Sequence, residues 1–177
     1  IFPIMVGLIV VSKPLIILLL TDKWKNSILY MQILCLYWMT QPIQTTNWQI
    51  IKAVGRSDLC LKLEIIKKTI GVVLVIVAMK YGVLAIALSA ALFGIISMVI
   101  NILPNKKLIN YSILEQMIDI MPALLASSGM GLVVYSISFF NFPILIQIIV
   151  QIVTGCFCYV GLSYIFKIEA FSYIISI

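Results

Sequence analysis

Charged residues are scarce in this sequence, and histidine is missing altogether. Only 10% of the 177 residues are charged, 63% are hydrophobic, and none is histidine. A soluble domain averages roughly 25% charged residues, so the composition excludes an ordinary soluble protein. Three stretches, residues 26–51, 81–105 and 120–166, contain no Asp, Glu, Lys or Arg. Alternating strands of a membrane barrel are not seen. We therefore predict an all-α integral membrane protein.

Residue types that carry chemistry are also missing. With no histidine, no paired carboxylates and no Gly-rich phosphate loop, the sequence shows no catalytic set. Its four cysteines, Cys35, Cys60, Cys156 and Cys158, lack C-x-x-C or zinc spacing. We expect no catalytic residue, metal site, cofactor or nucleic-acid partner, and a membrane transporter in place of an enzyme.

A signal peptide is likewise not seen, since no basic start or small-residue cleavage site precedes the first apolar stretch. That stretch begins at once after Ile1. We expect a fragment whose beginning is missing.

Six stretches qualify as transmembrane helices, each of which needs about 20 mainly apolar residues. The expected spans are residues 2–20, 27–51, 64–80, 82–103, 117–140 and 143–166, followed by a tail at 168–177. The last two are divided where Pro143 fits the first turn of a new helix.

The third span is unusual because it is short of apolar residues. It crosses only if the lysines at its two ends extend to the membrane surfaces, and we expect an amphipathic interfacial stretch, residues 58–68, to run into it. Residues 80–82 leave room for a tight turn only, so the third and fourth spans should pack as a hairpin. The small-residue pairs Ala90-xxx-Gly94 and Ser127-xxx-Gly131 predict close helix contacts.

The distribution of basic residues predicts the orientation. With six spans, one side of the membrane collects eight Lys and Arg, namely Lys52, Arg56, Lys62, Lys67, Lys68, Lys106, Lys107 and Lys167. The other side collects Lys23, Lys25 and Lys80. Because positive residues favour the cytoplasm, we expect a cytoplasmic C-terminus.

Within this apolar chain, "YWMTQPIQTTNWQIIKAVGRSDL" at residues 37–59 is conspicuously polar. At 100° per residue, one helical arc collects Gln41, Gln44, Thr45, Trp48, Gln49 and Lys52, with Asn47 off its edge. Pro42 should kink the helix. These amides either hydrogen-bond neighbouring helices or line a wet cavity, and the size of the arc favours the cavity. A lysine within a span suggests a functional site, so Lys13 is a further candidate, with snorkelling as the alternative.

Several segments resemble a known family. "KPLIILLLTDKW", "MQILCLYWMTQPI", "NWQIIKAVGRSDLCLKLEIIKK" and "YSILEQMIDIMPALLAS" are similar to the oligosaccharide flippase (polysaccharide biosynthesis protein) family of the multidrug/oligosaccharidyl-lipid/polysaccharide exporter superfamily. The resemblance implies that residues 1–167 are the C-terminal lobe of a two-lobed transporter with 12–14 helices.

By this resemblance, the whole protein carries undecaprenyl-pyrophosphate-linked oligosaccharides across the bacterial inner membrane by alternating access, for lipopolysaccharide, capsule or exopolysaccharide assembly. Its partners would be that lipid-linked substrate, membrane lipids, the missing N-terminal lobe and the polysaccharide polymerase machinery. The expected substrate cavity comprises Lys13, Gln41, Gln44, Thr45, Trp48, Gln49, Lys52 and Arg56.

Two other functions stay open. One is a cation-coupled multidrug exporter of the same superfamily, for which Glu115 and Asp119 are the candidate acids, although both lie near the expected interface. The other, from a different class, is a membrane-embedded glycosyl- or acyltransferase, which the missing catalytic set disfavours.

Overall fold

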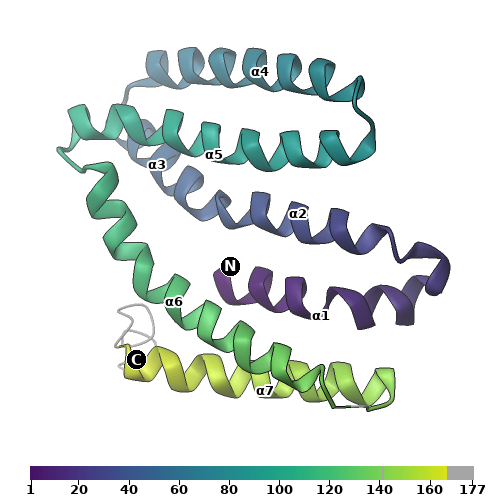
Figure 1. Ribbon diagram of the computed structural model, residues 1–177. Coiled ribbons are helices and arrows are strands. Elements are labelled where there is room, and N and C mark those ends of the chain that lie inside the picture. The colour runs from purple at the N-terminus through teal and green to yellow at the C-terminus, as the bar shows by residue number, and fades with distance from the viewer. Residues whose placement is uncertain (141, 167–177) are drawn as a thin grey trace. The chain divides into compact units, whose positions relative to one another are not determined.

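The computed structural model describes residues 1–140 and 142–166, and over these residues the protein is helical and contains no strand. Figure 1 shows the elements in chain order. They are α1 (Phe2–Leu20), the short 3₁₀ helix η1 (Asp22–Trp24), α2 (Ser27–Met39), α3 (Gln41–Ala53), α4 (Ser57–Met79), α5 (Val83–Leu108), α6 (Ile113–Ile137) and α7 (Ile144–Ile165). The expected tail at 168–177, together with Asn141 and Lys167, lies outside the described residues.

Four of these helices are long and apolar enough to cross a membrane. Their apolar segments are Phe2–Leu20, Val83–Lys106, Ile113–Ile137 and Ile144–Ile165. They coincide with four of the six expected spans, and α7 begins directly after Pro143, as its fixed backbone angle favours. The structure therefore has the character of a helical membrane protein.

The other two expected spans look different. Residues 27–51 lie in two helices of 13 residues each, α2 and α3, which are separated at Thr40 and end at Ala53. A helix of 13 residues is only about 20 Å long, short of the ~30 Å hydrocarbon core. The expected span 64–80 lies in the longer α4, which ends at Met79 and whose first half carries its charged residues. The expected interfacial stretch and third span thus form one continuous helix.

The chain forms two compact units. Unit A contains residues 1–32 and the chain from residue 118 onward, and unit B contains residues 33–117. In unit A, α1 packs against α7, and Val11, Met130, Val134 and Ile148 form the buried apolar cluster. A methyl group added to Gly131 would lie 2.5 Å from Cγ1 of Val6, so the close approach expected at this glycine is present.

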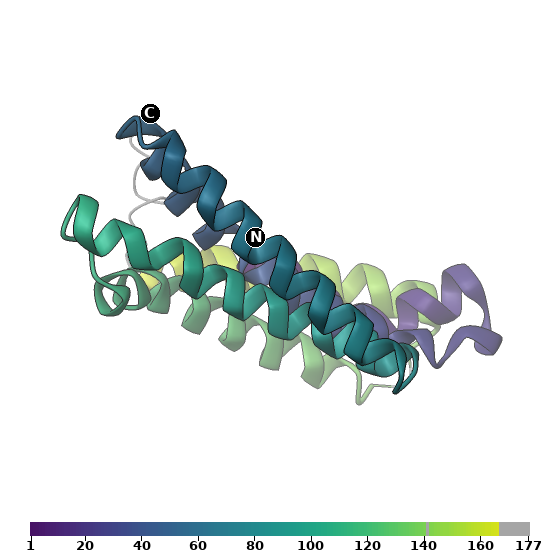
Figure 2. The ribbon, with the colours of Figure 1, turned by 90° about the horizontal axis from the view of Figure 1, so that it is seen from above.

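In unit B, α4 and α5 form the expected hairpin, visible in Figure 1 and in Figure 2. The turn between them uses Gly82, whose φ of 93° is accessible to glycine at no steric cost. Helix α3 packs on both α4 and α5. One side of the polar stretch therefore packs against the hairpin of unit B.

Candidate functional site: the polar stretch of α3

The helix break before α3 lies next to Pro42, and the polar side chains of Thr40 and Gln44 form hydrogen bonds across it. Pro42 has no backbone N–H, so it cannot bond to the carbonyl one turn earlier. Thr40 turns its N–H and its hydroxyl back to the Tyr37 carbonyl, at 3.1 Å and 2.8 Å. The side-chain amide of Gln44 then donates to Thr40 Oγ1 at 2.9 Å and to the Gly94 carbonyl of α5 at 3.3 Å. The kink expected at Pro42 is thus present as a one-residue interruption at Thr40, whose backbone stays in the right-handed helical region.

Gly94 lets this break lie against α5. A methyl group at Gly94 would stand 2.8 Å from Tyr37 Cδ2 and 3.1 Å from Thr40 Oγ1. Real side chains essentially never approach that closely, so any larger residue would push the break away from α5. The close contact predicted at Ala90-xxx-Gly94 is therefore present and has a specific partner.

Helix α3 buries one side and exposes another. Its buried residues are Ile43, Gln44, Asn47 and Ile51, which centre about 250° around the helix from Gln41 at 100° per residue. Thr45, Gln49 and Lys52 are exposed, and Gln41 and Trp48 are half-buried. Most of the predicted cavity arc therefore points away from the packing of unit B, whereas Gln44 points into it.

A buried amide network on the packed side joins α3 to α5 and α6. The Asn47 side chain is 2% exposed. Its Nδ2 donates to the Ile43 carbonyl at 2.8 Å and to Gln116 Oε1 at 2.7 Å. Asn105 in turn donates from Nδ2 to the side-chain oxygen of Asn47 and to its backbone carbonyl. Hydrogen bonding to neighbouring helices was the alternative role for the amides of this stretch. Asn47, which lies off the edge of the predicted arc, makes most of these bonds.

This network has unused hydrogen-bonding capacity. Four buried polar atoms have no partner among the described residues: Asn105 Oδ1 and Gln116 Nε2 of the network, and Ser97 Oγ and Asn101 Oδ1 earlier on α5. A buried unpaired group costs about 1–3 kcal/mol. Ser97, Asn101 and Asn105 follow one another at four-residue spacing, which places them on one face of α5. This face can accept further polar partners such as water.

Two lysine side chains lie near the Trp48 ring, toward the C-terminal end of α3. Lys67 Nζ lies 4.4 Å from the centre of this ring and Lys52 Nζ lies 5.9 Å from it. Such contacts contribute about 0.5–1 kcal/mol at exposed sites. Glu64 pairs with Lys67 at 3.3 Å, so the positive charge of Lys67 is partly neutralised, whereas Lys52 occurs in none of the ion pairs between described residues.

Arg56, the last predicted cavity residue of this stretch, is held by Asp58. Its Nε and Nη2 donate to the two carboxylate oxygens at 3.0 Å and 3.1 Å. The hydrogen bond from Arg56 lowers the pKa of Asp58, and the same bond and charge raise the pKa of Arg56. Both side chains are exposed, so the pair orders the link between α3 and α4 more than it stabilises the fold.

Lys13, the remaining predicted cavity residue, belongs to unit A. It is exposed on α1 between the buried Ser12 and Pro14. Ser12 Oγ accepts a 3.0 Å hydrogen bond from the side-chain amide of Gln32. Lys13 does not line the pocket of unit A.

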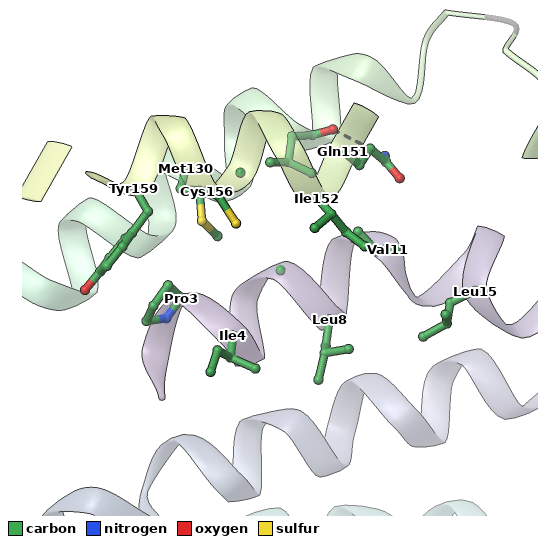
Figure 3. A pocket seen from close by; sticks show the side chains of 13 residues that line it. Pro3, Ile4, Leu8, Val11, Leu15, Met130, Gln151, Ile152, Cys156 and Tyr159 are labelled. Carbon is green, nitrogen blue, oxygen red and sulfur yellow. Dashed lines mark hydrogen bonds between the residues drawn. The ribbon is translucent and has the colours of Figure 1, made fainter. Parts of the chain in front are cut away.

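That pocket is apolar and lies between α1, α6 and α7 (Figure 3). Its volume is about 380 Å³. It is lined by Pro3, Ile4, Gly7, Leu8, Val11, Leu15, Met130, Val134, Gln151, Ile152, Gly155, Cys156 and Tyr159. None of the eight predicted cavity residues is among them. Those residues were chosen for their polarity, whereas the walls of this pocket consist mainly of apolar side chains.

The acidic residues considered for cation coupling lie at the start of α6. Glu115 Oε2 accepts a hydrogen bond from the Ser112 N–H at 2.7 Å, and the Glu115 N–H donates to Ser112 Oγ at 3.3 Å. This reciprocal pair is a capping box, which gives Glu115 a structural role. Asp119 is exposed. Groups of three or more His, Cys, Asp or Glu able to hold a metal do not occur within residues 1–140 and 142–166.

No protein-family model, curated protein or solved structure matches the chain. The functional assignment therefore depends on the residues themselves and on the sequence resemblance described above. Sequence reasoning missed the roles of Asn47, Asn105 and Gln116, because these residues lie far apart in the chain and only helix packing brings them together. Their one sequence signal was polarity inside apolar stretches.

Proposed function

We propose that the protein is part of a flippase for undecaprenyl-pyrophosphate-linked oligosaccharides, working by alternating access in the bacterial inner membrane. In this proposal the chain provides the C-terminal lobe, with six spans and a cytoplasmic C-terminus, and α2 and α3 together cross as one broken helix. In the same proposal, an N-terminal lobe supplies the other half of the cavity.

The exposed polar side of α3 is the observation that carries the proposal. In a chain of 63% hydrophobic residues, Thr45, Gln49 and Lys52 are exposed on one side of a helix whose other side is packed. Polar groups facing hydrocarbon are costly, so a water-filled cavity is the environment that suits this side. The sequence segments that resemble oligosaccharide flippases include this helix.

The chemistry of the substrate matches these groups. A pyrophosphate needs compensating cations, and sugar hydroxyls need hydrogen-bonding amides and hydroxyls. Lys52 is the best placed cation because it occurs in none of the ion pairs between described residues, whereas Arg56 is held by Asp58. Gln49 and Thr45 supply hydrogen bonds, and Trp48 offers a flat apolar surface to a sugar ring. Gln44 supports the helix break instead of contacting substrate.

The cation-coupled multidrug exporter is the second candidate. It requires an acidic residue available to bind a cation inside the membrane. Glu115 closes a capping box, which argues against that role for this carboxylate.

The test is complementation in a strain that lacks the full-length parent gene, with lipid-linked oligosaccharide measured on each leaflet of the inner membrane. Deletion should trap the lipid on the cytoplasmic leaflet and abolish surface polysaccharide. The variant Lys52→Gln removes a charge-assisted contact of about 1.5–3 kcal/mol, so transport should fall about ten- to hundredfold. Lys62→Gln, an exposed lysine on α4, is the matched control and should transport normally.

Two results would overturn the proposal. Normal glycan in the deletion strain, with raised sensitivity to cationic drugs, would favour the multidrug exporter. Normal transport by a variant carrying Gln49→Leu together with Lys52→Gln would remove the exposed side of α3 from the transport path.

A further inference from the structure

We propose that the apolar pocket of unit A is a binding slot for one acyl chain of a membrane phospholipid. The pocket follows α1 lengthwise, with Pro3, Ile4, Leu8, Val11 and Leu15 along one wall (Figure 3). Twelve residues separate the first and last of these, which corresponds to about 18 Å of helix. The opposite wall is formed by α7, from Gln151 to Tyr159.

The dimensions fit a single hydrocarbon chain. The volume of the slot is about 380 Å³, and its lining runs along ~18 Å of α1. The space is therefore elongated, a shape that suits an extended hydrocarbon chain. Its length is close to half of the ~30 Å hydrocarbon core, the depth of one leaflet.

The polarity of the lining also fits an acyl chain. Gln151 is the one amide among the lining residues, and it is only 1% exposed. Its Nε2 donates to Ser138 Oγ at 2.9 Å and to the Val134 carbonyl at 3.4 Å, so these donors are used within unit A. Tyr159 and Pro3 lie together at one end (Figure 3). A tyrosine near a membrane surface is a common interfacial residue, and it marks this end as the place for the lipid headgroup.

Two glycines keep the slot open. A methyl group at Gly7 would lie 3.8 Å from Met130 Cε, an ordinary contact, and one at Gly155 would lie 3.3 Å from Val134 Cγ2. Position 7 therefore tolerates a small side chain, while a larger one must extend into the slot. Gly161, further along α7, has nothing within 4 Å of an added methyl group and is exposed. The same substitution at Gly161 leaves the slot unchanged.

The test uses the full-length protein in vesicles of phosphatidylethanolamine and phosphatidylglycerol. A fraction of the phosphatidylethanolamine carries a photoreactive diazirine in the middle of one acyl chain, and labelled residues are located by peptide mass spectrometry. Labelling should concentrate on Leu8, Ile152 and Cys156 over Phe157, an outward residue of α7 that is 77% exposed. Gly7→Leu displaces the contacts of about two methylene groups and should lower labelling of the slot about tenfold. Gly161→Leu should leave it unchanged.

The variant Gly7→Ala provides a graded second measurement, since its methyl group fits without displacing Met130. It should retain helicity by circular dichroism and show labelling between that of wild type and Gly7→Leu. Labelling of the slot no stronger than that of Phe157 would overturn the proposal, as would labelling insensitive to Gly7→Leu. Slot residues left unlabelled because another segment of the full-length protein covers them would also overturn it.

Discussion

Replacing Asn47 by leucine should destabilise unit B, because Asn47 connects three helices through its side chain. Leucine has the same number and branching of side-chain heavy atoms, so the change mainly removes hydrogen bonds. It breaks the bond to Gln116 and the side-chain bond from Asn105, whose side chains are 3% and 0% exposed. At the membrane average of about 0.6 kcal/mol per bond the loss is ~1.2 kcal/mol. If both groups are left unpaired, it approaches about 4 kcal/mol.

The free energy of unfolding of the full-length protein is measured by reversible unfolding in mixed micelles with sodium dodecyl sulfate. Thr46→Val is the matched control, since the neighbouring Thr46 is exposed and its hydroxyl bonds within α3 only; it should change stability by less than about 0.5 kcal/mol. A double-mutant cycle of Asn47→Leu with Gln116→Met should give a coupling energy of about 0.6–1.7 kcal/mol. A loss as small as that of the control, with no coupling, would refute the assigned network.

Two further predictions concern the helix break and the link between α3 and α4. Gly94→Ala places a methyl group 2.8 Å from Tyr37 Cδ2 and should lower the free energy of unfolding by about 1–3 kcal/mol, whereas Gly161→Ala should not; equal effects would contradict the close contact. Because Arg56 lowers the pKa of Asp58, the pair stabilises the fold above the ordinary carboxyl pKa and loses this effect as pH falls through the lowered value. Carboxyl-carbon NMR should find the Asp58 pKa below 3.8 and show it rising in Arg56→Gln.

The helix break illustrates how far local sequence reasoning reaches. Pro42 predicted a kink, because the lost N–H is a property of the residue itself. The packing of this interruption against α5 depends on Gly94, which is more than fifty residues away in the chain, because the Gly94 carbonyl accepts a hydrogen bond from Gln44 and its missing side chain leaves room for Tyr37. No local pattern contains that partner.

For the same reason, the sequence predicted only in part which residues of the cavity arc are exposed and which are buried. Helical periodicity separates a polar side of α3 from an apolar side, and Thr45, Gln49 and Lys52 are exposed as this separation implies. Periodicity does not tell which polar residue faces a neighbouring helix. Gln44, in the predicted cavity arc, and Asn47, off its edge, are both buried in the packing of unit B. Membership of the cavity itself stays a prediction.

By itself, the sequence predicted the helical class, four helices long and apolar enough to cross a membrane, the break after residue 140 and the hairpin at Gly82. These follow from composition, from runs of apolar residues and from the backbone limits of proline and glycine, all of which are local. The six spans that the sequence indicates stay a prediction. Only the tertiary structure decided that Asn47 meets Asn105 and Gln116, that Glu115 caps α6, and that α1 and α7 enclose an apolar slot. Such features require side chains from distant segments to meet in specific geometry, and hydrophobic periodicity carries no information about which helix faces which.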